Sequence, residues 1–469
     1  MTADVPPAAS ADSSTRAERT PSAERVTALR ARVHDLFGGL RSDLEALVRI
    51  PSVSNREFDQ GFVEQSAEAV AALLRGVGLE DATVLRVPGG APAVVGHHAA
   101  PAGAPTVLLY AHHDVQPVGD VGEWQTAPFE PTVRGDRLFG RGAADDKAGV
   151  VAHVGALRAL AGELGVGVTV FVEGEEEVGS PTFLEFLRTH REALAADVVV
   201  VADATNWKVG VPGLTTSLRG LVSAVVEVAV LDHPIHSGMY GGPVLDAPTL
   251  LARLIATLHD DEGAVAVSGL LQGPDPVVDD DEDTFRADAG LLDGVRLAGS
   301  GPITARLWTR PALGVIGLDA PRVATASNTI APRASALLSL RVAPGQDPDA
   351  ALAALERHVR EHAPFGAPVT FTAVDRGRAF QAPADSPAMR TARWALGEAW
   401  GAEPADIGVG GSIPFIAELL EVFPEAAILV TGVEDPDSRA HGPNESVHLG
   451  ELERAVLAEV LLLERLAGR

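Results

Sequence analysis

The sequence contains several short apolar runs, each about as long as a β-strand, that stop abruptly at charged or turn-forming residues. These runs are TVLLY (106–110), VTVFV (168–172), VVVVA (198–202) and AAILVTG (426–432). A run that is apolar at every position fits a parallel strand that is buried on both faces of a sheet. Stretches with a helical pattern, notably 147–162 and 181–195, lie between the runs. This alternation predicts an α/β fold, in which a mostly parallel sheet is sandwiched between helices.

The amino-terminal part of the chain divides into a polar tail and two predicted helices. Residues 1–24 are rich in Ala, Ser, Pro and Thr and have no apolar periodicity, so we expect a disordered tail. A helical pattern runs from Arg25 to Pro51, and a second one covers 62–77. We find neither the apolar stretch of a secretion signal nor a run long enough to span a membrane, so we expect a cytoplasmic protein with no membrane association.

The pattern changes between residues 217 and 378. A strand (221–230) and a helix are followed by a long acidic, glycine-rich segment, and then by two strands, a second helix and a last strand (368–374). The order β-α-β-β-α-β is that of a ferredoxin-like fold. We therefore expect residues 217–378 to form an inserted α+β domain, and residues 25–216 and 379–469 to form the α/β domain that receives it.

Charge and composition exclude several classes of function. The chain has 64 acidic residues against 37 Lys and Arg, and its formal charge of −27 repels nucleic-acid phosphates and anionic membranes. It has no cysteine, so any transition metal must be bound by His, Asp and Glu. We expect the acidic run VVDDDED (277–283) to be a solvated loop, with a specific cation site as the alternative.

The residues that follow the apolar runs are of the types that bind divalent cations. The first three runs lead into HHD (112–114), EGEEE (173–177) and Asp203, with only Ala111 between the first run and HHD. A polar loop with His441 follows the fourth run. DD (145–146) precedes a predicted helix. Ligands collect at the carboxyl ends of parallel strands. Carboxylates held together there would repel one another and be forced to protonate unless cations compensate their charge.

Two catalytic zinc ions that share one carboxylate need about five protein ligands. The best candidates supply that number. We assign Asp145 as the shared ligand, His112 and Asp203 to one ion, and Glu177 and His441 to the other. A set of nitrogen and oxygen ligands suits two divalent ions, Zn²⁺ in the first place and Mn²⁺ or Co²⁺ as alternatives.

Two more roles follow from positions next to these ligands. Asp114 comes two residues after His112 and can accept its free ring N–H, which would orient the ligand. His113 could be mistaken for the ligand, but the spacing to Asp114 favours His112. Glu176, adjacent to Glu177, is expected to be the general base for a metal-bound water. Each of these residues alone could be a hydrogen-bonded rim residue or part of a solvated loop; their joint occurrence at strand ends predicts the site.

The order of these motifs resembles a known family. The matching strings are AHHDVQP (111–117), FGRGAADDK (139–147), EGEEEVGS (173–180), VVVADA (199–204), HPIHSGMYGG (233–242), GGSIP (410–414) and AHGPNE (440–445). They resemble the dinuclear zinc amidohydrolases and peptidases that include aminoacylase, carnosinase-type dipeptidases, glutamate carboxypeptidase and succinyl-diaminopimelate desuccinylase, and are most similar to the dipeptidase branch. The resemblance implies the roles given above, a cis peptide between Asp145 and Asp146, and an inserted domain that acts in closure and dimerisation. His113 stands where that family usually has an aromatic residue, which puts the substrate fit in question.

The resemblance also adds residues that spacing alone does not identify. His236 would reach across a homodimer and stabilise the oxyanion in the partner's active site. Asn328 and Arg341 would bind the substrate, and the arginine would pair with its carboxylate. Gly411 and Ser412 would form a loop that holds the same carboxylate. The alternatives are that His236 is a surface histidine and that Arg341 pairs with one of the many acids nearby.

These inferences predict a cytoplasmic, homodimeric hydrolase that cleaves dipeptides or short peptides with a free C-terminal carboxylate. Glu176 would take a proton from a bridging water, the hydroxide would attack the scissile carbonyl, and His236 would help to hold the oxyanion. An N-acyl-amino-acid amidohydrolase, a deacylase or desuccinylase with the same mechanism, is the alternative. A non-catalytic metal-binding or scaffold protein is a third interpretation, which the presence of every expected ligand and of the base argues against.

Overall fold

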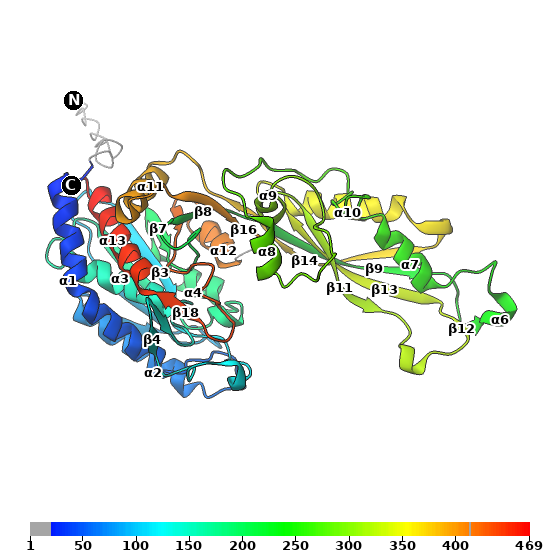
Figure 1. The fold of residues 1–469 in the computed structure, drawn as a ribbon, viewed down its shortest axis with the longest axis horizontal. Coiled ribbons are helices and arrows are strands. Elements are labelled where there is room, and N and C mark those ends of the chain that lie inside the picture. Colours follow the sequence, from blue (N-terminus) through cyan, green and yellow to red (C-terminus); the bar gives the residue numbers. More distant parts are fainter. Residues whose placement is uncertain (1–19, 412–413) are drawn as a thin grey trace, which may run out of the picture. The chain divides into compact units, whose positions relative to one another are not determined.

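A computed structural model describes residues 20–411 and 414–469 of the 469-residue chain. The chain forms two compact units, drawn as ribbons in Figure 1. The first comprises Met1–Leu214, Pro383–Ala405 and Glu418–Arg469, and the second comprises Thr215–Ala382 and Asp406–Ala417. Residues 1–19 of the predicted tail lie outside the described residues, and helix α1 begins at Ala23, two residues before the predicted start.

A largely parallel sheet forms the centre of the first unit. Within this unit its strands follow the order β1-β2-β6-β3-β7-β17. Four strands pair in parallel and coincide with the four apolar runs: β3 (Thr106–His112), β6 (Gly167–Glu173), β7 (Val198–Val201) and β17 (Ala427–Val430). The short strands β1 (Thr83–Leu85) and β2 (Ala93–His98) extend one edge in antiparallel pairing. Every residue of β6 and β7 is buried, and the predicted mostly parallel sheet is confirmed.

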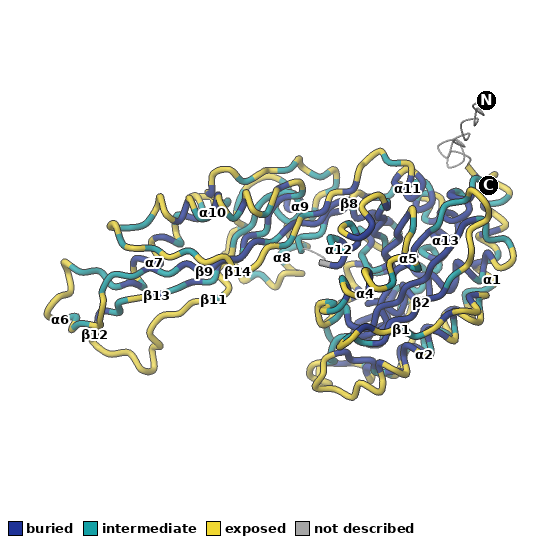
Figure 2. The backbone as a smooth tube through the Cα atoms, turned by 180° about the vertical axis from the view of Figure 1, so that it is seen from behind, coloured by how far each residue is buried: buried dark blue, intermediate teal, exposed yellow. Residues whose placement is uncertain are grey.

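Helices cover both sides of this sheet. α1 (Ala23–Val48), α3 (Lys147–Ala159) and α13 (Leu449–Leu466) pack together on the side that faces the viewer in Figure 1. α4 (Phe183–Thr189) and α5 (Arg191–Leu194) lie on the opposite side, which faces the viewer in Figure 2. One helix was expected over 181–195; His190 leaves the helical region, with φ −105° and ψ 24°, and divides it into these two.

Further helices and strands complete the first unit and connect it to the second. They are α2 (Gly61–Gly76), α11 (Pro387–Trp400) and a three-stranded sheet of β4 (Thr132–Arg134), β5 (Arg137–Phe139) and β18 (Ser446–His448). β8 (Gly213–Leu218), β15 (Phe380–Gln381), β16 (Ala405–Val409) and α12 (Pro414–Val422) lie where the chain passes between the units. In the described part of the chain, no helix combines the length and the hydropathy of a membrane span.

An antiparallel four-stranded sheet forms the second unit. Its order is β11-β13-β9-β14, with β9 (Gly220–Ala229), β11 (Ala312–Asp319), β13 (Arg333–Val342) and β14 (Val369–Gly377). The helices α7 (Ala247–Ala256) and α10 (Pro348–Glu361) follow β9 and β13 along the chain. The order β-α-β-β-α-β confirms the predicted ferredoxin-like arrangement.

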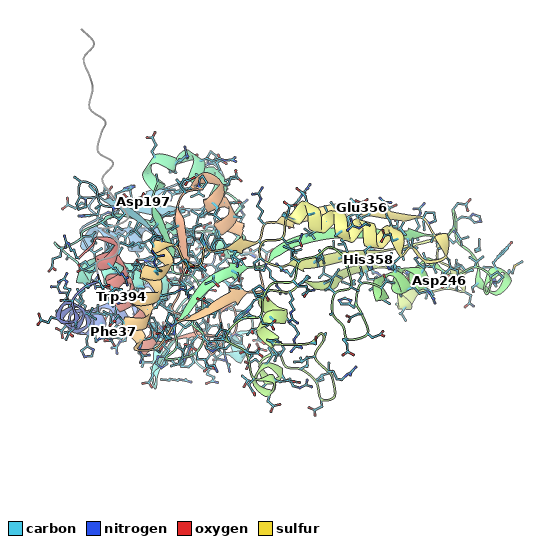
Figure 3. The ribbon with its side chains drawn as sticks, turned by 90° about the horizontal axis from the view of Figure 1, so that it is seen from above. Phe37, Asp197, Asp246, Glu356, His358 and Trp394 are labelled. Carbon is cyan, nitrogen blue, oxygen red and sulfur yellow. The ribbon has the colours of Figure 1, made fainter. Side chains whose placement is uncertain are left out.

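One apolar core joins the sheet and helices of the second unit. Leu254 of α7 and Leu355 of α10 pack with Val226 of β9. His358 of α10, labelled in Figure 3, also contacts the end of α7, because its Nε2 lies 3.1 Å from the Thr257 hydroxyl. Because both helices pack on the same sheet and on each other, the unit has a core of its own.

The acidic run lies in the long segment between α7 and β11, which holds α8 (Glu282–Asp288) and α9 (Ile303–Trp308). Asp281 caps α8 by accepting a hydrogen bond from Thr284 N at 3.1 Å. Asp279 accepts one from Thr304 N, also at 3.1 Å. The run therefore serves local backbone structure, and none of its residues belongs to the groups of potential cation ligands found in the described residues.

Candidate metal centre

The candidate ligands lie at the ends of neighbouring parallel strands in the first unit. His112 is the last residue of β3 and pairs in register with Glu173, the last residue of β6. Glu176 and Glu177 follow in a short 3₁₀ turn, and Asp203 comes two residues after the end of β7. Because β6, β3 and β7 are neighbours, their carboxyl ends bring these side chains to one edge of the sheet.

Asp145 lies between the two candidate histidines. Its Oδ1 is 2.9 Å from His112 Nε2, and its Oδ2 is 2.9 Å from His441 Nε2. Glu177 Oε2 lies 3.1 Å from His441 Nε2, and Asp203 Oδ2 lies 4.0 Å from His112 Nε2. The structure thus brings all five candidate ligands together, with one oxygen of Asp145 facing each pair. The Asp145–Asp146 peptide bond is cis.

The donor set fits two divalent cations. The donor atoms form two overlapping groups, and within each group all donor atoms lie within 4.8 Å of one another. The groups are His112, Glu176 and Asp203, and His112, Asp145 and Glu177. Each group combines one imidazole with two carboxylates, the nitrogen and oxygen donors that catalytic zinc uses. Asp145 has a histidine next to each of its two carboxylate oxygens. Two ions that share one aspartate require this arrangement.

The carboxylates and imidazoles of this cluster shift one another's pKa values. Burial raises the pKa of Asp203 to about 7. The hydrogen bonds that His441 donates to the carboxylates of Asp145 and Glu177 raise the pKa of His441 to about 11. Burial works against ionisation of Asp145 as well, but hydrogen bonds from His112 and His441 outweigh it and hold the pKa of Asp145 below its usual range. Divalent cations would take the place of these shared protons, since they supply positive charge to the same oxygen and nitrogen atoms.

Glu176 and Glu177 differ sharply in exposure although they are adjacent. The Glu176 side chain is 25% exposed, and its Oε2 lies 4.0 Å from His112 Nε2. The Glu177 side chain is 2% exposed, and its Oε1 accepts a hydrogen bond from Gln116 N at 3.1 Å. Burial, the largest influence, raises the pKa of Glu176 to about 8. Glu176 can therefore contact a water molecule and hold a proton near neutral pH, whereas the Glu177 carboxylate is held in place by His441 and the backbone of Gln116.

Asp114 has more contacts than the sequence indicated. His112 Nδ1 lies 3.1 Å from the backbone oxygen of Asp114 and 3.4 Å from its Oδ1, so the carbonyl is the nearer acceptor. The carboxylate accepts hydrogen bonds from the backbone N–H groups of Glu176, at 3.3 Å, and Glu177, at 3.0 Å. Asp114 thus fixes both the ring of one ligand and the turn that carries the glutamates.

His113 is fully buried and supports the backbone. Its Nε2 lies 2.9 Å from the carbonyl oxygen of Pro92, and burial lowers its pKa to about 4, so the ring is neutral and donates this hydrogen bond. A side chain at Gly174 would meet the same carbonyl at 2.3 Å and His113 Nε2 at 2.8 Å. The His113 ring and the Pro92 carbonyl therefore lie directly against Gly174 and leave no room for a side chain there.

The other predicted site residues belong to the second unit. His236 ends β10 (Ile235–His236), is exposed, and accepts a hydrogen bond from Gly238 N through Nδ1 at 3.0 Å. Asn328 lies next to it, because its carbonyl accepts hydrogen bonds from both the backbone and the hydroxyl of Ser237, the residue after His236. Arg341 lies on β13, paired in register with Leu221.

The loop predicted to hold the substrate carboxylate is only partly described. Gly411 is half-buried, and Ser412 lies outside the described residues.

Sequence reasoning missed a buried pair, Arg141 and Glu445, that contacts the backbone of two candidate ligands. Both residues lie inside matching strings, FGRGAADDK and AHGPNE. The available signal was one arginine in the first string and one glutamate in the second, but nothing in the local sequence indicated that the two form a pair.

Comparison with known proteins identifies the family of this chain. The family described as peptidase family M20/M25/M40 matches residues 108–465. The chain belongs to this family. It is 36% identical over 411 residues to the cysteinylglycine-S-conjugate dipeptidase of Corynebacterium striatum, a match that covers 85% of this chain and 89% of that protein. The predicted family resemblance is confirmed.

Two solved structures show the same M20 fold. The di-peptidase Dug1p of Saccharomyces cerevisiae matches with a TM-score of 0.72 and 20% identity, over 96% of this chain and 100% of that one. Human carnosine dipeptidase 1 matches with a TM-score of 0.71 and 23% identity, over 95% and 99% of the two chains. These structures confirm the predicted α/β fold class for the M20 chain.

Proposed function

We propose that this chain hydrolyses the peptide bond of dipeptides or short peptides with a free C-terminal carboxylate, in a reaction that needs two divalent cations. The observation that carries the proposal is Asp145, whose two carboxylate oxygens each face a different histidine at 2.9 Å. Family membership and the names of two relatives, the dipeptidase of C. striatum and the Beta-Ala-His dipeptidase of Rattus norvegicus, which is 27% identical over 73% of each chain, support peptides as the substrate.

The distances among the five side chains support the ligand assignment. His112 and Asp203 would hold one cation, Glu177 and His441 the other, and Asp145 would be shared. Bound there, Zn²⁺, or Mn²⁺ or Co²⁺ in its place, would polarise the scissile carbonyl and stabilise the negative charge that develops on its oxygen. Asp114 would hold the ring of His112 in the orientation that presents Nε2.

Glu176 is proposed to move the proton in this reaction. Its carboxylate would accept a proton from the attacking water and return it to the leaving amine. A general base works best when its pKa lies near the operating pH, and burial has already moved the pKa of Glu176 in that direction, to about 8. The hydrogen bonds from the Glu176 and Glu177 backbone to Asp114 would keep the carboxylate in place during the transfer.

The second unit is proposed to bind the substrate and to close over it. Arg341 would pair with the C-terminal carboxylate, and Asn328, Gly411 and Ser412 would add hydrogen bonds to it. His236 would stabilise the oxyanion in the active site of a partner subunit. Its exposure and its place beside Asn328 support a role in contacts beyond its own unit.

A homodimer would form through this unit. β11 is an edge strand of the four-stranded sheet, and Figure 2 shows that much of it is exposed. It carries exposed apolar side chains, Ile316 at 66% and Leu318 at 61%. An open apolar edge of this kind favours pairing with another strand. Sedimentation of the purified protein should give the mass of a dimer; a monomer at micromolar concentration would contradict this part of the proposal.

A substrate panel tests the proposal. Purified protein would be stripped with a chelator, reloaded with Zn²⁺, Mn²⁺ or Co²⁺, and assayed on dipeptides and on N-acetyl and N-succinyl amino acids. We expect dipeptide hydrolysis that disappears on chelation and returns with the metal. Faster hydrolysis of the N-acyl amino acids would assign a deacylase instead, and no hydrolysis across the panel would refute an enzymatic role.

A further inference from the structure

A buried ion pair joins two segments of the first unit that carry proposed metal ligands. Arg141 lies in the turn between β5 and α3, and Glu445 immediately precedes β18. Arg141 is 1% exposed and Glu445 is fully buried. Their side chains meet at 2.5 Å, Arg141 Nη1 to Glu445 Oε2. Burying two charges costs free energy unless further hydrogen bonds satisfy their remaining atoms, so the partners of each side chain show what the pair holds in place.

Glu445 binds the backbone that leads to Asp145. Its Oε2 accepts a hydrogen bond from Gly142 N at 3.0 Å. Its Oε1 accepts hydrogen bonds from Ala144 N at 3.0 Å and from Asp145 N itself at 3.1 Å. One carboxylate therefore fixes three backbone N–H groups in the four residues up to the shared ligand.

Arg141 binds the backbone of His441 and its neighbour. Its Nη2 donates to the carbonyl oxygen of His441 at 3.0 Å and to that of Gly442 at 3.3 Å. His441 has φ +62° and Asn444 has φ +65°, a region that side-chain-bearing residues seldom occupy. A loop in this conformation needs contacts from outside to hold it, and Arg141 supplies them at the ligand itself.

We propose that Arg141 and Glu445 are positioning residues that set the site of the second cation, the one assigned to Glu177 and His441. Glu445 fixes the backbone of Asp145, Arg141 fixes the backbone of His441, and the ion pair ties the two together. This inference rests on the proposed function. Among the described residues, neither side chain of the pair hydrogen-bonds to His112 or Asp203. Arg141 therefore acts on the second cation through His441, whereas Glu445 reaches the first cation only through the shared Asp145.

Arg137 provides a matched control. It belongs to β5 and holds the same carboxyl-terminal loop at its base, where it donates to Asp435 Oδ1 at 3.0 Å and to Ser446 Oγ at 2.8 Å. None of these partners is a proposed ligand. An Arg137→Lys variant therefore loosens the loop without removing a contact to His441 or to the turn before Asp145.

The experiment compares wild-type protein with Arg141→Lys and Arg137→Lys. Lysine keeps the positive charge beside Glu445 but cannot make the several directed contacts of a guanidinium. Metal-free protein would be titrated with Zn²⁺ by calorimetry, with the number of bound ions read by native mass spectrometry and folding checked by circular dichroism. We expect two ions in the wild type and in Arg137→Lys, and in Arg141→Lys one ion of unchanged affinity and one bound about 10- to 100-fold more weakly.

The outcomes separate this inference from the proposed function. Fewer than two ions on the wild type would refute the two-cation centre and the positioning role with it. Two ions on the wild type, combined with unchanged affinities in Arg141→Lys or an equal loss in Arg137→Lys, would overturn the positioning role alone. If Arg141→Lys does not fold, Glu445→Gln carries the test: because Asp145 is shared, both affinities should fall, and wild-type affinities would overturn the inference.

Discussion

The two adjacent glutamates allow a sharp test of the proposed chemistry. Glu176→Gln and Glu177→Gln make the same chemical change one residue apart. The structure predicts different consequences, because the Glu176 side chain is 25% exposed and the Glu177 side chain is 2% exposed and 3.1 Å from His441 Nε2. Glu176→Gln should keep both metals and lose turnover, whereas Glu177→Gln should lose affinity for one metal.

The magnitude follows from the role of the lost group. A positioned general base contributes about 10²- to 10⁴-fold to a rate. At about 1.4 kcal/mol for each factor of ten, that is about 3–6 kcal/mol of transition-state stabilisation. Glutamine has the size of glutamate, so Glu176→Gln should change the stability and the metal content little. The loss should fall on kcat, because the proton is transferred only after the substrate has bound.

The assay is steady-state dipeptide hydrolysis at saturating Zn²⁺, with the metal content of each variant measured in the same samples. Glu176→Gln should contain two metal ions per chain and show kcat reduced at least 100-fold. Glu177→Gln should show a metal content that falls below two ions as Zn²⁺ is diluted. A fully loaded Glu176→Gln variant that works within tenfold of the wild-type rate would refute the assignment of Glu176 as the base.

Three further predictions concern stability. Gly174→Ala places a Cβ 2.3 Å from the Pro92 carbonyl oxygen and should lower the free energy of unfolding, measured in urea, by about 1–3 kcal/mol. Gly38 lies in α1 with open space around it, so Gly38→Ala should raise the free energy of unfolding by about 0.5–1 kcal/mol. Burial alone would lower the pKa of His153, but the Glu459 carboxylate, 2.8 Å from its Nδ1, outweighs burial and raises it. Because its pKa is raised, His153 contributes its full stabilisation at pH values below the ordinary histidine pKa near 6.5, and less as the pH rises above that value. Glu459→Gln should remove this part of the pH dependence of thermal unfolding. An unchanged pH profile would contradict the pairing of His153 with Glu459. Zn²⁺ at 100 times its Kd should add about 2.7 kcal/mol for each site to the stability of the metal-free protein, and no rise in the unfolding temperature would argue against binding to the folded state.

The sheet and the ligands could be predicted because both follow local rules. Runs that are apolar at every position predict parallel strands that are buried on both faces of a sheet. The topology of such a sheet then brings the residues at the carboxyl ends of the strands together. The antiparallel strands β1 and β2 were not predicted, since β1 has only three residues and β2 ends in the polar pair His97 and His98. The break at His190 was missed for a similar reason, as nothing in the local pattern interrupts the helix there.

The supporting contacts of the site could not be predicted, because their partners are far apart in the sequence. Arg141 and Glu445 are separated by 304 positions, and His153 and Glu459 by 306. Charge and residue type identify such groups as candidates for pairing, but only the fold selects the partner. The same limit applies to Asp114, where the sequence indicated the contact to the His112 ring and not the hydrogen bonds to the glutamate turn.

The central claim is that one aspartate is shared by two cations. Anomalous scattering at the zinc absorption edge, measured on crystals of the Zn²⁺-loaded protein, tests it most directly. We predict two peaks, one between Asp145 Oδ1 and His112 and the other between Asp145 Oδ2 and His441. A single peak, or two peaks that do not both contact Asp145, would contradict the account.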